Sequence, residues 1–403
     1  MIKKTGIVAL LILITVMAVQ AGTIYSKWPN APQDPNFFLI SVWLQRIDKI
    51  PKYKAIGINT YIAIDGKNDA KSWKALKNSG MYLAATVTSS LAWDHYDDKE
   101  FQKTLIAWLM PDEPDNCQHS NYVIKGKRFP SSGNFPNNCF IPPDQLTAMC
   151  EWVRKNDPTR PVYTNFGCGI TDDDTPNRGG AWNNEKYPQM MKGPDIVGYD
   201  IYPVFTHARD MIWLQAQGLD RIKKWSDNKP MWNCFECTAR GAPGIRVPSP
   251  NDLRSEIWIS IIHGSMGLIY FCHEFNPECD WAFLNYPDMT DAAKKVNGLI
   301  KQLAPVLNSP NVMNEATVVS SNELVPIDIM LKEYDGKLYI FSAGVRSGKT
   351  KGTFTIPKLL GSSAYANVAG EARGINIENG SFTDNFNSWD AHIYSIPIKT
   401  AVK

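Results

Sequence analysis

The sequence has almost no excess of charge of either sign. Its 403 residues include 42 Lys and Arg against 40 Asp and Glu. A balanced chain has no extended positive field that would attract nucleic acid or an anionic membrane, so we expect neither as a partner. Hydrophobic residues make up 44% of the chain, with 27 Gly and 27 Pro, and this composition excludes a disordered or collagen-like polypeptide.

Long apolar runs are absent except at the N-terminus. The basic residues Lys3 and Lys4 precede an apolar run over 7–16, and Val19-Gln20-Ala21 fits a peptidase site. The run is shorter than the roughly 20 residues of a membrane span, which leaves an anchor as the alternative. We predict a signal peptide over residues 1–21, a secreted or periplasmic location and a mature chain that is not bound to a membrane. Loss of the two lysines lowers the formal charge from +2 to 0.

The eight cysteines lack the spacing of a structural zinc site. Only Cys234-x2-Cys237 is a tight pair, whereas such sites usually contain two. An even number of cysteines in an exported chain instead favours disulfides. Two pairs each bracket a segment rich in Pro, Asn or Gly, so we predict the bridges Cys117–Cys139 and Cys272–Cys279, although sequence alone leaves other pairings open. We expect neither a metal nor a cofactor.

Short apolar runs alternate with amphipathic helical stretches from residue 37 onward. This alternation of predicted strands and helices predicts a parallel sheet. Eight runs qualify as strands: 38–43, 57–64, 82–89, 105–110, 161–166, 196–204, 230–236 and 267–273. Helices are expected at 69–79, 143–156, 208–225, 251–264 and 290–307. No glycine-rich phosphate loop follows the first run, so a (β/α)8 TIM barrel fits better than an open doubly wound sheet.

The pattern changes after Pro310 to alternating segments separated by turns, including Asp335-Gly336. We therefore predict a barrel over residues 22–310 and a small antiparallel β-sandwich domain over 311–403. The second domain has no cluster of Asp, Glu and His, so we expect it to pack against the barrel. Carbohydrate binding by this domain is the alternative.

Two glutamates are candidates for catalysis at the C-terminal ends of strands, where the active sites of such barrels lie. The fourth run leads into Pro111-Asp112-Glu113-Pro114-Asp115, and the apolar seventh run ends in Glu236. A pair of carboxyl groups that face each other across a barrel mouth can cleave a glycosidic bond, one as proton donor and one as nucleophile.

In these features the chain resembles the retaining glycoside hydrolases of clan A, over about residues 35–308. The resemblance implies that Glu113 is the acid/base, that Glu236 is the nucleophile and that Tyr202 hydrogen-bonds the nucleophile. The clan usually has Asn before the acid/base, whereas this chain has Asp112, which can accept a hydrogen bond from a sugar hydroxyl but cannot donate one as an amide does. The segment around Trp389 also resembles the C-terminal β domain of such enzymes.

Further side chains at the predicted strand ends suit a sugar, because aromatic faces stack on its C–H surfaces and short polar groups bind its hydroxyls. The predicted substrate contacts are Asp112, Tyr202, Asn59, Asn165, His273 and Trp281. Trp43 and Trp182 are further candidates for stacking, and Glu274 is a rival nucleophile. The acidic run 172–174 could bind calcium, but neighbouring acids point apart, so we favour a solvated loop.

The sequence therefore predicts a secreted, monomeric, retaining glycoside hydrolase that acts on a β-linked oligo- or polysaccharide without a cofactor. Two alternatives remain open, a non-catalytic carbohydrate-binding barrel and an inverting hydrolase. The separation of the two carboxyl groups distinguishes the mechanisms, since retaining enzymes need about 5–5.5 Å and inverting enzymes about 6.5–9.5 Å.

Overall fold

The computed structural model describes residues 23–65, 69–117, 121–130, 140–171, 173, 184–206, 211–239 and 247–398. The predicted signal peptide lies outside these residues. No helix within them is long and apolar enough to cross a membrane.

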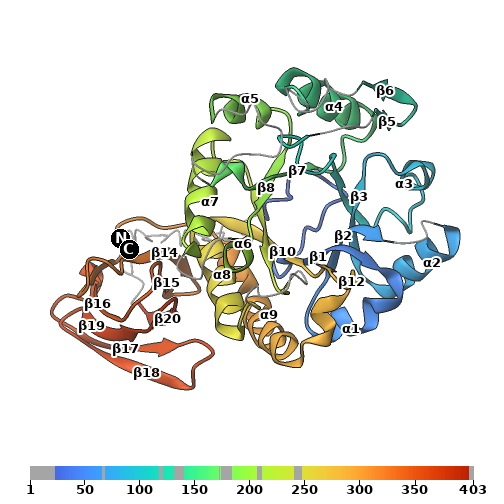
Figure 1. Ribbon diagram of the computed structural model, residues 1–403. Coiled ribbons are helices and arrows are strands. Elements are labelled where there is room, and N and C mark those ends of the chain that lie inside the picture. The colour runs from blue at the N-terminus through green and yellow to red at the C-terminus, as the bar shows by residue number, and fades with distance from the viewer. Residues whose placement is uncertain are drawn as a thin grey trace, which may run out of the picture.

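Eight parallel strands form a closed barrel (Figure 1). They are β1 (Leu39–Arg46), β2 (Thr60–Asp65), β3 (Tyr82–Thr86), β4 (Leu105–Leu109), β7 (Val162–Phe166), β8 (Ile196–Asp200), β9 (Met231–Glu236) and β10 (Ser265–Phe271). Their hydrogen-bonded order is β1-β10-β9-β8-β7-β4-β3-β2, so the first strand pairs with the last, with Leu39 opposite Gly267. Each predicted strand overlaps one of these eight, which confirms the barrel.

Helices surround the barrel between successive strands (Figure 1). They are α1 (Ile50–Ala55), α2 (Ala70–Ser79), α3 (Ser90–Asp94), α4 (Pro143–Asn156), α5 (Tyr187–Met190), α6 (Pro203–Thr206), α7 (Leu214–Trp225), α8 (Pro250–Ile262) and α9 (Pro287–Leu307). Local sequence sets several of their ends. The Asp69 side chain caps α2 by accepting a hydrogen bond from Ser72 N, and a capping box of Ser249 and Asp252 begins α8.

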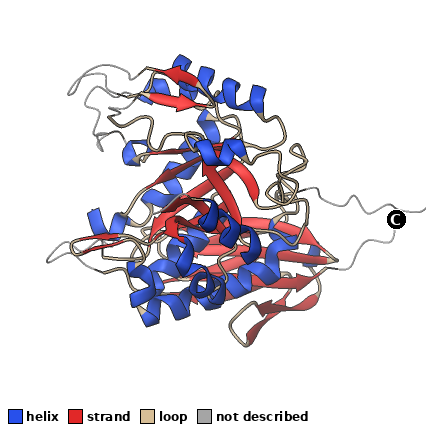
Figure 2. Cartoon of the chain, turned by 90° about the vertical axis from the view of Figure 1, so that its right-hand side faces the viewer, coloured by secondary structure: helices blue, strands red, loops and turns tan. Residues whose placement is uncertain are grey.

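The C-terminal residues form an antiparallel, sandwich-like domain of eight strands, seen in red with the barrel strands in Figure 2. The strands are β13 (Thr317–Ser320), β14 (Ile327–Tyr334), β15 (Lys337–Gly344), β16 (Thr350–Thr355), β17 (Ser363–Val368), β18 (Arg373–Glu378), β19 (Ser381–Phe386) and β20 (Ala391–Pro397). Asp335 and Gly336 have φ values of 48° and 67° and join β14 to β15, as expected for a two-residue hairpin turn.

Helix α8 packs between the barrel and the C-terminal domain. Its residues contact β9 and β10 on one side and β14, β15 and β20 on the other. Such a helix is buried around most of its circumference, which explains why it lacks a polar face. The Trp258 and Phe341 rings lie 6.1 Å apart, and Ser255 Oγ donates to Trp389 O at 2.7 Å. The second domain therefore packs on the barrel, as expected from its sequence.

Two short hairpins extend from the barrel, β5 (Tyr122–Ile124) with β6 (Lys127–Phe129), and β11 (Glu274–Phe275) with β12 (Glu278–Cys279). The second hairpin shows that the predicted Cys272–Cys279 bridge is wrong. Its register places Cys279 opposite Glu274, whereas Cys272 is buried beside Cys237 of the neighbouring strand, and no bond joins Cys272 to Cys279. Cys117 is disulfide-bonded, but its predicted partner Cys139 lies outside the described residues, so that pairing stays a prediction.

A histidine at the end of α8 links the two domains. His263 Nδ1 lies 3.0 Å from Asp220 of α7, and its Nε2 lies 3.2 Å from Asp328 of β14. Burial by itself would lower the pKa of His263, but the contacts of the ring with the two carboxylates raise this pKa to about 9. The imidazolium is therefore a charged bridge at neutral pH.

Replacement of His263 by Gln should lower the free energy of unfolding at pH 6 by about 1–2 kcal/mol, since both carboxylates are partly exposed and screened. The folded-state pKa lies above the unfolded one, so this contribution is complete below pH 6.5 and is lost as the pH rises through 9. Denaturant unfolding of the wild type and the variant between pH 6 and pH 10 measures this contribution to the free energy of unfolding. A difference between wild type and variant that does not change with pH would contradict a charged bridge.

Candidate active site

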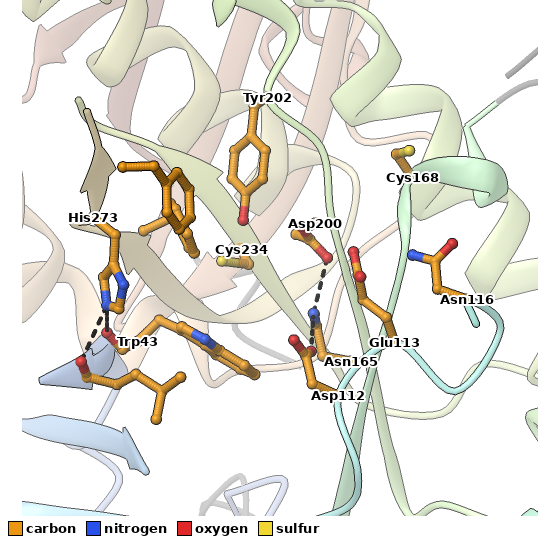
Figure 3. A pocket seen from close by; sticks show the side chains of 13 residues that line it. Trp43, Asp112, Glu113, Asn116, Asn165, Cys168, Asp200, Tyr202, Cys234 and His273 are labelled. Atoms are coloured by element: carbon orange, nitrogen blue, oxygen red, sulfur yellow. Dashed lines mark hydrogen bonds between the residues drawn. The ribbon is translucent and has the colours of Figure 1, made fainter. Parts of the chain in front are cut away.

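A cavity of about 430 Å³ opens among the residues that follow the C-terminal ends of the barrel strands (Figure 3). Five of the predicted site residues line it: Asp112, Glu113, Asn165, Tyr202 and His273. The other lining residues are Trp43, Leu44, Asn116, Cys168, Asp200, Cys234, Phe271 and Phe275. The predicted candidate for stacking, Trp43, is thus among its walls.

Glu113 enters the cavity from the turn that follows β4. The backbone N–H of Glu113 donates to Asn165 O at 2.9 Å, and that of Met110 donates to Tyr163 O at 2.9 Å, so the turn continues the pairing with β7. Glu113 has a φ of 44°, in the left-handed region that residues other than glycine rarely occupy. Such strained residues cluster at functional sites, where the surrounding structure fixes the direction of a side chain.

A second carboxylate of the same turn, Asp115, has a different position. It is fully buried and accepts hydrogen bonds from Gly167 N and Tyr187 Oη, both at 2.9 Å. Burial raises the pKa of Asp115 to about 6, although these two hydrogen bonds oppose the shift. Asp115 does not line the cavity. It attaches the turn to the segment after β7 and so supports the backbone that carries Glu113.

Asn165 connects two further carboxylates at the base of the cavity (Figure 3). Its Nδ2 donates to Asp112 Oδ1 at 3.1 Å and to Asp200 Oδ1 at 2.9 Å. These two oxygens are therefore at most about 6 Å apart, because each lies one hydrogen-bond length from the same nitrogen. The Asn165 amide is held in turn by Tyr163, whose hydroxyl donates to Asn165 Oδ1 at 3.2 Å.

Asp200 was not among the predicted site residues. The predicted sixth strand extends over 196–204, which places its end at Tyr202 and beyond, whereas β8 ends at Asp200 itself. The signal that could have identified it is a carboxylate at the last position of an otherwise uncharged strand, the same signal that pointed to Glu236. Asp200 is 8% exposed and faces the cavity.

Glu236 occupies the expected place at the end of β9 but does not line the cavity. Its side chain is fully buried, and its carboxylate accepts hydrogen bonds from Val204 N at 2.5 Å and Phe205 N at 3.0 Å. Cys234, two residues earlier, does line the cavity and is hydrogen-bonded to the side chain of Tyr202. The structure thus brings Glu113 together with Asp112 and Asp200, and directs the Glu236 carboxylate toward α6.

Three other predicted residues have clear positions. His273 Nε2 lies 3.1 Å from the carbonyl oxygens of Trp43 and Leu44, at the wall of the cavity. Trp281 does not line this cavity; Lys49 Nζ lies 4.2 Å from the centre of its ring. The position predicted for Asn59 is wrong: it precedes β2 and hydrogen-bonds the backbone at the start of β1, so it lies at the N-terminal end of the barrel.

The remaining candidates lie elsewhere. Glu274 accepts a hydrogen bond from the Tyr286 hydroxyl and does not line the cavity. Asp173 forms an ion pair with Arg221 at 3.1 Å, while Asp172, Asp174 and Trp182 lie outside the described residues. Among the residues that the structure describes, no group of three or more His, Cys, Asp or Glu could hold a metal ion.

No family model and no curated protein matches this sequence. Solved structures match its fold. An alpha-amylase from Anoxybacillus superimposes with a TM-score of 0.56 at 9% identity, over 92% of this chain and 100% of the amylase. An alpha-amylase from Geobacillus thermoleovorans, complexed with acarbose, gives 0.53 at 9% identity over the same shares. The maltogenic alpha-amylase AmyB of Thermotoga neapolitana gives 0.50 at 11% identity, over 90% of this chain and 98% of that one.

These identities are too low to transfer a substrate or a mechanism, but the likeness covers both domains. The chain shares the fold of these proteins, and its own strands form a closed barrel followed by a β domain. Fold alone does not fix activity, which has to be argued from the cavity.

Gly167 leaves room for two side chains of the cavity. A Cβ at this position would lie 2.7 Å from Asn116 Nδ2 and 3.3 Å from Glu113 Oε1. The backbone at Gly167 has a φ of −79° and a ψ of 177°, which alanine also adopts, so the constraint is steric rather than conformational.

Replacement of Gly167 by Ala should therefore displace Asn116 and Glu113 while the barrel still folds. If this cavity is a catalytic site, we expect kcat/KM for its substrate to fall by about 10- to 100-fold, with a small change in melting temperature. Gly298→Ala is the matched control, because nothing lies within 4 Å of a Cβ there. Unchanged activity in Gly167→Ala would mean that the position of Glu113 does not matter.

Proposed function

We propose that this protein is an exported glycoside hydrolase that cleaves a β-linked oligo- or polysaccharide and needs no cofactor. One observation supports the proposal most directly: three carboxylates converge on a single cavity among the strand ends, and an indole forms part of its wall. The carboxylates are Asp112, Glu113 and Asp200, and the indole belongs to Trp43. A sugar needs this combination, because its C–H faces stack on aromatic rings while its hydroxyls donate to carboxylates.

Glu113 is the proton donor in this proposal. It is partly exposed in the cavity and its backbone is fixed by Asn165 and by the turn of Asp115, so its carboxyl group is held toward bound substrate. Protonation of the glycosidic oxygen by Glu113 allows the leaving sugar to depart. Asp112 and Asp200, joined through the amide of Asn165, accept hydrogen bonds from the hydroxyls of the sugar whose bond is cleaved.

Glu236 is the nucleophile of the proposed double displacement. Its carboxylate is held by the amides of Val204 and Phe205, which are charge-assisted hydrogen bonds. Attack on the anomeric carbon requires the side chain to rotate from these amides into the cavity on substrate binding. The attack forms a covalent glycosyl-enzyme, and Glu113 then activates the water that hydrolyses it.

A second mechanism is favoured by the position of Asp200. This carboxylate already faces the cavity, so it can activate a water molecule without any rotation, with Glu113 as the acid. Such a single displacement inverts the anomeric configuration. A third possibility is a carbohydrate-binding barrel that does not catalyse hydrolysis.

Three variants distinguish these mechanisms: Glu113→Gln, Glu236→Gln and Asp200→Asn. We expect Glu236→Gln to lose about 10³-fold or more in kcat, and the wild type to release product with retained configuration, followed by NMR. Asp173→Asn is the control, since this exposed residue lies outside the cavity. Inverted product together with loss of activity in Asp200→Asn would establish the second mechanism. Binding of a glycan without turnover of any substrate would establish the third.

A change in the leaving group of the substrate tests the role of Glu113 separately. Glu113→Gln should lose most activity on a β-linked polysaccharide, because a sugar leaving group needs a proton. Formation of the glycosyl-enzyme from a dinitrophenyl glycoside should be nearly unaffected, because that leaving group departs as an anion. The pre-steady-state burst of dinitrophenolate measures this step. An equal loss on both substrates would show that Glu113 is not the proton donor.

A further inference from the structure

Two cysteines lie side by side where β9 and β10 end. Cys237 follows β9 directly, and Cys272 follows β10 directly. The last residues of the two strands, Glu236 and Phe271, are partners in the parallel register, so the two cysteines are the next pair along. Their Sγ atoms lie 4.0 Å apart, although the residues are 35 positions apart in sequence.

The two chain segments stay together beyond the cysteines. Thr238 and His273 are the next pair of residues after the cysteines, and Thr238 Oγ1 donates to His273 O at 2.8 Å. Contacts before and after the thiols therefore hold the two backbones in register. Neighbouring strands lie about 4.8 Å apart, within the Cα separation of about 4.4–6.8 Å that disulfides span. The two sulfurs have to approach each other by about 2 Å to reach the bonding distance of about 2.05 Å.

The surroundings of the pair limit when a bridge can form. Both cysteines are fully buried, and Cys237 Sγ is 3.1 Å from Phe271 O. Burial raises the pKa of Cys237 well above its ordinary value, and the hydrogen bond to Cys272 raises it further, so the folded thiol is unreactive. The side chain of Tyr53 in α1 lies beside Cys272 and helps to close the site. A bridge must therefore form during folding, before α1 covers the pair.

We propose that Cys237 and Cys272 are joined by a disulfide in the mature protein, and that this bridge fixes the ends of β9 and β10 beside the cavity. The inference rests on the proposed export of the chain, because disulfides form and persist in oxidising compartments. It does not depend on which carboxylate acts as nucleophile.

The oxidant is a second disulfide, either a protein oxidant of the exporting compartment or oxidised glutathione. One cysteine thiolate attacks a sulfur of the oxidant, which forms a mixed disulfide and releases one thiolate. The other cysteine thiolate then attacks the mixed disulfide, which forms the Cys237–Cys272 bond and releases the second thiolate. The two protons of the cysteines pass to the released thiolates, and the two electrons reduce the oxidant.

The bridge lies next to groups of the proposed active site. Cys237 follows Glu236, and Cys272 precedes His273, whose ring bonds the backbone at Trp43 in the wall of the cavity. A covalent link at this point holds the two strand ends at a fixed spacing. It would limit the freedom of the β9 end when the Glu236 side chain changes its position.

Peptide mapping of the full chain tests the proposal without any measurement of activity. The reduced, denatured protein is refolded in a glutathione redox buffer, free thiols are alkylated in denaturant, and the bridges are then reduced and labelled with a second reagent. We expect the Cys237 and Cys272 peptides to carry the second label and to be linked before reduction. Alkylation of both by the first reagent, or a bridge from Cys272 to Cys279, overturns the proposal. The same peptide mapping, done on protein isolated from an oxidising compartment, tests the proposed export separately from the ability of the two cysteines to form a bridge.

Thermal unfolding with and without reductant gives an independent measurement. Reduction should lower the melting temperature of the wild type by about 5 °C more than that of the Cys237→Ala/Cys272→Ala variant, because a bridge across a long loop constrains the unfolded chain. The disulfide at Cys117 is present in both proteins and cancels in this comparison. Cys150→Ala, which removes a buried thiol outside this pair, should respond to reductant as the wild type does. An equal response in wild type and double variant contradicts the bridge.

Discussion

The hydrogen bonds between β1 and β10 close the sheet, and the position of every candidate catalytic group depends on this closure. All eight barrel strands are parallel, so their C-terminal ends meet on one face. Glu113, Asp200 and His273 are separated by long stretches of sequence, yet they line one cavity because each follows or ends a different strand of the closed sheet. An open sheet with the same strands would spread these side chains along an edge.

The acidic turn after β4 shows how one short segment can serve two purposes. Asp115 is buried and holds the turn against Gly167 and Tyr187, while Asp112 and Glu113 face the cavity. The three carboxylates differ in environment although they are almost adjacent in sequence. The turn can present Glu113 in a left-handed conformation only because these buried hydrogen bonds stabilise it.

The C-terminal domain is connected to the active-site face through α8. This helix carries Glu256, which is fully buried, accepts a hydrogen bond from Gln215 at 3.0 Å and lies near the backbone of Glu236. Burial raises the pKa of Glu256 well above its ordinary value, and the nearby charges of Glu236 and Asp252 raise it further. Glu256 thus lies beside the end of β9, on a helix that the second domain covers. Loss of that domain would expose the opposite side of α8.

The sequence by itself determined the barrel and the second domain, because alternation of strands and helices follows from local periodicity and local turn signals. It also located the turn of Glu113, since rigid acidic turns after apolar strands are visible along the chain. Only the tertiary structure decided which carboxylates share the cavity. It brought Asp200 to Asp112 through Asn165, directed Glu236 to the amides of α6, and placed Cys272 beside Cys237 rather than Cys279. These outcomes depend on the exact ends of strands and on neighbours across the sheet, and neither is encoded in the spacing of residues along one segment.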